Sequence, residues 1–483
     1  MKAYYCTALV LCLCALCSVS AAAGEQEAET LTMPVLYASE IPEDMDLVSD
    51  AVSQLVWQEI GVQVELIPVL YSTASSGQDQ LRQSELNLLE KQGIEFDILP
   101  SILQSGSFLP LDDLMEQYGQ NIVELVGEER LDLMRQDGIL YGLPSVSDYV
   151  SSLGLTMRED IVEKYQIDLS SLKTLEDIDE MFAYVSAREP NLDMVSGYRT
   201  RNGFISRLKA TRIDVEPFCS RSALDPQVLE NYYASEEYEQ IVSLFYQWQQ
   251  SGYIPDNLFF QDLNASSLVK GGTLFSYFSA YKPNIEYEES LSCGRDMVSI
   301  PLMEPMVTAS SLAITAHWGI NSNCEDPQKA MQLLDLLYTD ADLINLLSYG
   351  IENVHYVIQP DGTIAYPDGV TAENSGYQNT QSWLLPNQYP SLVWSGNDPN
   401  LWEKVKEYNE SARYSDTIAF APDLSDCADE LTEIQEVLDT YTDGLESGQL
   451  DPSIYLPQML EEMDAAGEEK VLEILQDQFD DWS

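Results

Sequence analysis

Histidine, the side chain most often used for proton transfer in enzymes, occurs at two positions, His317 and His355. Neither belongs to an H-E-x-x-H motif, and the sequence contains no G-x-S-x-G elbow and no G-x-x-x-x-G-K-[ST] loop. The 81 acidic residues make chance pairs of carboxylates so frequent that such a pair is no evidence of glycoside hydrolysis. Asp340 and Asp342 likewise lack the spacing of a calcium-binding EF-hand loop. We therefore expect no catalytic residue, no cofactor and no metal site.

Aromatic residues offer a different chemistry, because 7 Trp and 28 Tyr stand against 12 Phe. An aromatic face can stack on the C–H face of a sugar ring, and a tyrosine hydroxyl can also bond a sugar hydroxyl. Most of these rings must fill the interior. The candidates for ligand contact are those in loops near predicted strand ends, namely Tyr71, Tyr149, Trp318 and Trp383.

Segments with strand character alternate with segments of helical spacing over the first half of the chain. This alternation indicates α/β units with largely parallel strand pairing, in which ligands lie beyond the carboxyl ends of the strands. Loops at three such ends contain Ser39, Glu40, Tyr71 and Ser101. The predicted strands are 31–39, 62–70, 96–102, 139–146, 151–157 and 310–320. The predicted helices are 44–60, 78–92, two short helices over 111–126, 158–165, 175–188, 329–347 and the region from about 425 onward.

Charge and the N-terminus restrict the cellular setting. A net charge of −58 repels phosphate backbones and anionic membranes, so we expect no nucleic-acid partner. One lysine, an apolar run over 8–17 and the small residues 21–23 follow the pattern of a secretory signal, with a buried N-terminal helix as the alternative. We therefore expect an exported protein cleaved near Ala23.

The cysteines that follow the predicted signal allow two readings. Cys219, Cys293, Cys324 and Cys427 contain no C-x-x-C pair, so neither a zinc ribbon nor a thioredoxin-type centre is supported. In an exported chain they could form two disulfides in three connectivities, or remain free thiols.

Several segments together resemble a known family. LYASEIPEDMDLVSDAV, VQVELIPVLYS, FDIL and DGILYGLPS follow the signal in the order found in extracellular solute-binding proteins of the carbohydrate-type family 1 class, which serve ABC importers. DPQKAMQLLDLLYTDADLINLLSYGIENVHYVI and NQYPSLVWSGNDPNLWEKVKEYNESA look like the lipoprotein-type members with a characteristic C-terminal domain. The resemblance covers nearly all of the chain after the signal.

This resemblance implies an α/β, two-lobed, periplasmic-binding-protein-like (type II) fold with inter-lobe hinge strands and a helical C-terminal region. A sugar or oligosaccharide would bind in the cleft between the lobes of a monomer, and closure would present it to the transmembrane subunits of an ABC permease. The expected segments are the signal peptide 1–23, an acidic spacer 24–30, lobe 1 over 31–145, lobe 2 over 146–310, a return mainly to lobe 1 over 311–370, and the completion of lobe 2 with the C-terminal helices over 371–483.

The stretch from Gly138 to Met157 can be assigned a position in this expected fold. It carries one charge, Asp148, in a chain that is 22% charged. Pro144 and several serines exclude a membrane span. We expect 145–150 to be the first crossing between the lobes beneath a binding cleft, with Asp148 and Tyr149 as ligand contacts.

Three alternatives remain open from the sequence. A secreted carbohydrate-active hydrolase would release reducing ends from glycans, and a sensory receptor would present its ligand to a membrane signalling protein. The mode of surface retention is the third, because relatives usually carry a lipobox cysteine where this chain has Ala23. We expect a free protein without a lipid anchor.

Overall fold

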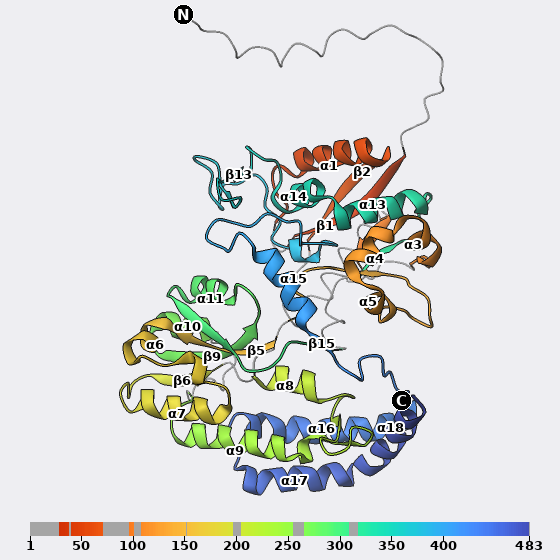
Figure 1. The fold of residues 1–483 in the computed structure, drawn as a ribbon. Coiled ribbons are helices and arrows are strands. Elements are labelled where there is room, and N and C mark those ends of the chain that lie inside the picture. The colour runs from red at the N-terminus through yellow and green to blue at the C-terminus, as the bar shows by residue number, and fades with distance from the viewer. Residues whose placement is uncertain are drawn as a thin grey trace, which may run out of the picture.

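The computed structural model describes residues 29–37, 40–70, 96–100, 108–150, 152–196, 204–254, 265–308 and 317–482. Figure 1 shows two lobes, with helix α15 running between them and helices α16, α17 and α18 at the far end of the second lobe. No helix within the described ranges is long and apolar enough to cross a membrane. The predicted signal, spacer and helix 78–92 lie outside those ranges, apart from the last two residues of the spacer.

Lobe 1 begins with a βαβ unit. Strand β1 (Thr30–Tyr37) pairs in parallel with β2 (Gln63–Leu70), and helix α1 (Met45–Ile60) connects them. The buried residues of α1 recur every three to four positions, so one apolar stripe faces the core. The helix ends at Gly61, whose φ of 70° lies in the left-handed region that glycine adopts without strain.

The remaining elements of lobe 1 come from two distant parts of the chain. Strand β12 pairs antiparallel with both β3 and β4, so a segment past residue 316 completes a sheet begun before residue 145. The elements are β3 (Ile98–Pro100), α3 (Asp112–Tyr118), α4 (Gln120–Val126), α5 (Glu128–Asp132), β4 (Leu143–Pro144), β12 (His317–Ile320), α13 (Pro327–Thr339), α14 (Ala341–Tyr349), β13 (Val357–Ile358), β14 (Ile364–Ala365) and the 3-10 helix η5 (Ser382–Leu384).

Lobe 2 contains a four-stranded sheet in the order β10-β5-β9-β6. Strand β5 pairs antiparallel with β9 and β10, and only β6 pairs with β9 in parallel. Its elements are β5 (Ser152–Arg158), α6 (Glu159–Tyr165), α7 (Leu175–Ser186), β6 (Asp193–Ser196), α8 (Phe204–Arg212), β7 (Cys219–Arg221), β8 (Leu229–Asn231), η3 (Tyr232–Ala234), α9 (Glu236–Gln250), α10 (Ala265–Gly271), β9 (Leu274–Tyr281), α11 (Ile285–Cys293) and β10 (Met297–Pro301).

The hinge region and the C-terminal helices complete the chain. Strand β11 (Met306–Val307) follows the last strand of the lobe 2 sheet, and strand β15 (Arg413–Tyr414) precedes the C-terminal helices. These two strands pair in parallel. Helix α15 (Leu401–Ser411) precedes β15. Helices α16 (Ala428–Glu446), α17 (Pro452–Ala465) and α18 (Glu468–Trp482) pack onto lobe 2 and share its core.

The two-lobed α/β fold with a helical C-terminal region is confirmed. The expectation of largely parallel pairing is wrong, because the strands that return from the second half of the chain insert antiparallel to their neighbours. The predicted helix 329–347 is interrupted at Asp340, whose carboxylate accepts a hydrogen bond from Leu343 N and begins a new helix. The predicted strand 139–146 is reduced to Leu143–Pro144.

The end of the lobe 1 return differs from the expected boundary at 370. Tyr377 and Leu385 are buried in the lobe 1 core, and the Tyr377 hydroxyl donates to the Leu347 carbonyl over 2.9 Å. The segment through η5 therefore belongs to lobe 1. The four cysteines of the described chain are free thiols, as one of the two readings allowed.

Candidate functional site

An exposed tryptophan lies at the carboxyl ends of the lobe 1 strands. Trp383, in η5, is 38% exposed. Its neighbour Leu384 is buried in a small cluster with Leu36, Val69 and Leu99, each of which lies one residue before the end of β1, β2 or β3. Ligands of α/β sheets bind beyond these strand ends, so Trp383 stands where a ligand of lobe 1 is expected.

Trp318 has a different role from the one that the sequence suggested. It was expected in a loop, but it lies within β12 and is 2% exposed. Its indole Nε1 donates to the Leu384 carbonyl over 2.8 Å. A ring inside the core offers no face to a ligand, and the hydrogen bond instead fixes η5 and thereby the position of Trp383.

The first crossing between the lobes runs beside the segment that follows Trp383. Val146 N donates to the Pro386 carbonyl and Gln388 N donates to the Val146 carbonyl, each over 2.8 Å. A short parallel bridge joins Val146 to Asn387. Trp383 and Asp148 are therefore carried by two backbone segments that are bonded to each other.

Asp148 is paired with a lysine at the end of a lobe 2 strand. Lys282 Nζ lies 2.6 Å from Asp148 Oδ2 and 3.1 Å from Glu288 Oε2. Burial by itself would lower the pKa of Lys282, but the two carboxylates raise it above its usual value. Lys282 is thus a cation at neutral pH, and it links the crossing segment to strand β9 and helix α11.

Tyr149 is half-buried against an arginine. The guanidinium of Arg130 lies 3.8 Å from the centre of the Tyr149 ring, and its Nη2 donates to the Ser145 carbonyl over 2.8 Å. Burial raises the pKa of the Tyr149 hydroxyl, although Arg130 acts in the opposite direction. One face of this ring is occupied by Arg130, so the hydroxyl and the other face are what Tyr149 can offer to a ligand.

A single asparagine holds the crossing segment from the side of α15. Asn409 Nδ2 donates to the Ser147 carbonyl over 2.7 Å and lies 2.9 Å from the Tyr389 hydroxyl. Its Oδ1 accepts from Val150 N over 3.3 Å. Tyr408, the preceding residue, donates to Ser152 Oγ and the Tyr281 carbonyl. Helix α15 therefore contacts the crossing and the start of lobe 2 at once.

The eight predicted ligand residues have different outcomes. Ser39, Tyr71 and Ser101 lie outside the described residues, and Glu40 is exposed just after β1. Asp148, Tyr149, Trp318 and Trp383 are gathered around the crossing by the hydrogen bonds given above. Lys282, Arg130 and Asn409 were missed, although a lysine in so acidic a chain is a signal for Lys282.

The chemistry available here is stacking and hydrogen bonding. The described part of the chain contains no group of three or more His, Cys, Asp or Glu side chains placed to hold a metal. His355 is buried, with Nδ1 accepting from Ile351 N and Nε2 lying 3.2 Å from Asp44 Oδ2. Its ring nitrogens thus serve local structure in lobe 1.

Comparison with known proteins agrees with this architecture. Residues 416–483 match the model of a domain of unknown function, DUF3502. The chain is 20% identical over 398 residues to a carbohydrate ABC transporter substrate-binding protein of Streptococcus pneumoniae serotype 4, covering 78% of this chain and 77% of that one.

Two solved structures are similar over almost the whole chain. The N-glycan transport solute binding protein NgtS from Streptococcus pneumoniae has a TM-score of 0.74 at 17% identity, covering 94% of this chain and 98% of that one. The same protein in complex with Man1GlcNAc has a TM-score of 0.63 at 17% identity, covering 94% and 99%. These findings agree with the resemblance that the sequence indicated: the chain has the two-lobed fold of these solute-binding proteins.

Proposed function

We propose that this protein is an extracytoplasmic receptor that binds a sugar or oligosaccharide between its two lobes and delivers it to an ABC permease. The observation that carries the proposal is the position of Trp383, an exposed ring at the carboxyl ends of three strands and bonded through its own segment to the inter-lobe crossing. The similarity to a carbohydrate ABC transporter substrate-binding protein supports the same ligand class.

Each residue of the proposed site has a role that follows from its contacts. Trp383 stacks on a sugar ring, and the Tyr149 hydroxyl and the free oxygen of Asp148 bond sugar hydroxyls. Lys282 orients Asp148, since the two side chains are 2.6 Å apart. Glu40 stays a candidate contact, as do Ser39, Tyr71 and Ser101, which lie outside the described residues.

Binding in such a receptor involves no chemical step. A ligand that contacts both lobes stabilises their closed arrangement relative to the open one, and the closed form is the one presented to the permease. The crossing at 145–150 lies between the two lobes, so a ligand bonded to Asp148 and Trp383 touches the moving part of the molecule. We propose that the receptor acts as an exported monomer.

A thermal-shift screen of the full chain against mono- and oligosaccharides, amino acids and peptides tests the ligand class. Ligand at about 100 times its Kd should stabilise the protein by ~2.7 kcal/mol. Stabilisation by an amino acid or peptide and by no saccharide would contradict the proposal.

A matched pair of tryptophans then tests the position. Trp383→Ala should weaken binding of the saccharide hit by about tenfold or more, as expected for a lost stacking face worth roughly 1–2 kcal/mol. Trp57→Ala is the control, because Trp57 lies on α1 and is similarly exposed, at 48% against 38%. Equal effects of both changes on affinity would show that the site lies elsewhere.

A further inference from the structure

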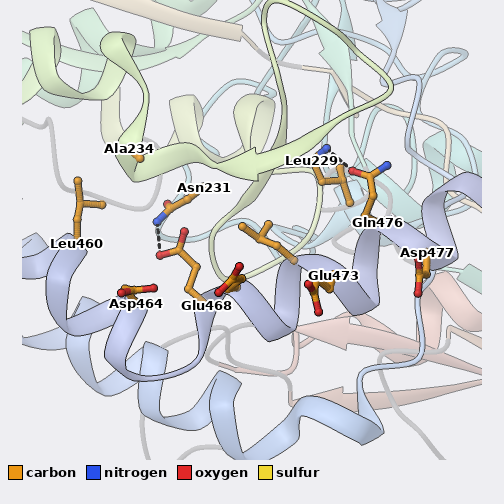
Figure 2. Close-up of a pocket in the computed structure, with 11 residues that line it drawn as sticks. Leu229, Asn231, Ala234, Leu460, Asp464, Glu468, Glu473, Gln476 and Asp477 are labelled. Atoms are coloured by element: carbon orange, nitrogen blue, oxygen red, sulfur yellow. Dashed lines mark hydrogen bonds between the residues drawn. The ribbon is translucent and has the colours of Figure 1, made fainter.

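A pocket lies in lobe 2, away from the crossing between the lobes. It has a volume of about 1060 Å³ and is lined by the β7–β8 hairpin, the start of α9, strand β15 and helix α18. It adjoins the pocket of about 830 Å³ in Figure 2, where Asn231 Nδ2 donates to Glu468 Oε2 over 2.9 Å. Both pockets include Asn231 and Glu468, so the two form one groove whose junction is this hydrogen bond.

The pocket has a buried donor that lacks an acceptor among the described residues. Tyr232 is 2% exposed, and its hydroxyl has no hydrogen-bond partner among the described residues. The charged groups that influence this hydroxyl most are Glu237 and Arg212, which line the pocket as well. Arg221 Nε is also buried, but it lies 3.5 Å from Asp214 Oδ1 in an ion pair. Leaving the Tyr232 hydroxyl unpaired costs about 1–3 kcal/mol, so an acceptor that reaches it is favoured.

The charges around the pocket restrict what that acceptor can be. Arg212, Arg221 and Arg413 line it, a concentration of guanidinium groups in a chain with 23 basic and 81 acidic residues. Arg212 is bonded to Glu237, and Arg221 is paired with both Asp214 and Asp416. Carboxylates outnumber the arginines, so an anion is repelled, while the guanidinium groups oppose a compact cation. The acids are Asp214, Glu230, Glu236, Glu237, Asp416 and Glu468.

A neutral molecule with many hydroxyl groups meets both demands. Each hydroxyl can accept from a tyrosine or guanidinium donor and at the same time donate to a carboxylate. Met306, Leu229 and Leu472 supply apolar lining for the C–H faces of such a molecule. The volume is at the upper end of the range found for small-molecule sites, which suits more than one sugar unit.

We propose that this pocket is a second binding site, for a neutral saccharide, in which Tyr232 donates a hydrogen bond to the ligand. The site is independent of the one around Trp383, since no residue of the crossing 145–150 lines it. The site lies between the earlier elements of lobe 2 and the C-terminal helices, because residues of both line it.

The test uses the full chain and three neutral probes, maltotriose, mannotriose and chitotriose, detected by saturation-transfer NMR. Tyr232→Phe removes the unpaired hydroxyl and keeps the ring, and it should weaken binding of the recognised probe about fivefold to tenfold. Tyr233→Phe is the matched control, because Tyr233 is the next residue of η3, is 3% exposed and does not line the pocket. It should leave the affinity unchanged.

Several results would overturn the proposal. These are the absence of binding by all three probes, equal weakening by Tyr232→Phe and Tyr233→Phe, or binding of sialyllactose or of a lysine-rich peptide alone. Trp383→Ala separates the two sites, because it should weaken saccharide binding between the lobes and leave the binding that depends on Tyr232. The two proposals can therefore fail separately.

Discussion

The two lobes complete their cores in different ways. The lobe 1 core takes residues from 31–146 and then from segments that return much later, including Trp318, Leu347 and Leu385. The lobe 2 core takes residues from 153–300 and continues without a break into α16, α17 and α18. The core of each lobe thus includes residues from distant parts of the sequence. In lobe 1 these residues belong to strands and helices inserted among the earlier elements, and in lobe 2 they belong to a layer of helices added at the C-terminus.

This difference shows that the DUF3502 region is a structural part of lobe 2. Ile434, Met459, Val471 and Leu475 are all fully buried in the same cluster as Phe245 of α9. Lobe 1 contributes none of the residues of that cluster. The C-terminal helices are therefore expected to set the stability of one lobe and to leave the other unchanged.

Removal of residues 416–483 is the change with the largest expected effect. It deletes the helical layer from the lobe 2 core and exposes the buried face of α9, which costs several large side chains at about 1.5–3 kcal/mol each. Hydrogen exchange should lose its slow phase in lobe 2 peptides and keep it in β1, α1 and α13 of lobe 1. Retained protection of β5 and β9 would show that lobe 2 has a core of its own.

Trp318→Ala should have the second largest effect, and it should act on the other lobe. The change removes a fully buried indole and its hydrogen bond to Leu384, which is expected to destabilise lobe 1 by about 3–5 kcal/mol. Hydrogen exchange measured at increasing denaturant concentration shows which lobe loses stability. Trp318→Phe is the control, because it keeps most of the volume and should lose mainly the positioning of η5. Equal stabilities of the two variants would contradict the packing role.

Asn409→Leu should loosen the connection between the lobes without unfolding either. It leaves the Ser147 carbonyl and Val150 N without their side-chain partner, at a cost of about 1–3 kcal/mol. Asn409→Asp keeps an acceptor for Val150 N and loses the donor to Ser147, so it should fall between the wild type and the leucine variant. Small-angle scattering should report a wider distribution of lobe separations. An unchanged distribution in both variants would show that α15 does not hold the hinge.

The sequence predicted local elements well and their assembly poorly. The helix 44–60 and the strand 62–70 agree with α1 and β2 within a residue or so, because apolar spacing and Gly61 mark their ends. Pairing of β12 between β3 and β4 could not be predicted in this way, since nothing local to 317–320 encodes partners more than 170 residues earlier. The expectation of parallel sheets failed at this step.

The candidate site shows the same limit. Asp148 and Tyr149 were predicted because the crossing is poor in charge, and Trp383 because it is an aromatic residue in a loop near a predicted strand end. Trp318 has the same residue type and a similar setting in the sequence, yet it lies inside the core and holds η5. Asn409 carries no local signal, because its importance depends on α15 running beside the crossing.

Glu468→Gln should have the smallest effect, and it sharpens the comparison at the contact between lobe 2 and α18. Burial raises the pKa of Glu468 above its usual value, although the hydrogen bond from Asn231 lowers it in part. The folded protein therefore favours the protonated side chain: stability is highest below the unfolded pKa of about 4.5 and falls as pH rises through the higher folded pKa.

Glutamine keeps the acceptor for Asn231 and cannot ionise. The variant should melt about 2 °C above the wild type at pH 7, and the two melting temperatures should converge near pH 4. Glu469→Gln is the control, because the neighbouring side chain is exposed and its replacement should leave the melting temperature at pH 7 unchanged. If the wild type is as stable as the variant at pH 7, the α18 contact tolerates the ionised carboxylate. The stability of lobe 2 would then depend less on its contact with α18 than the shared core implies.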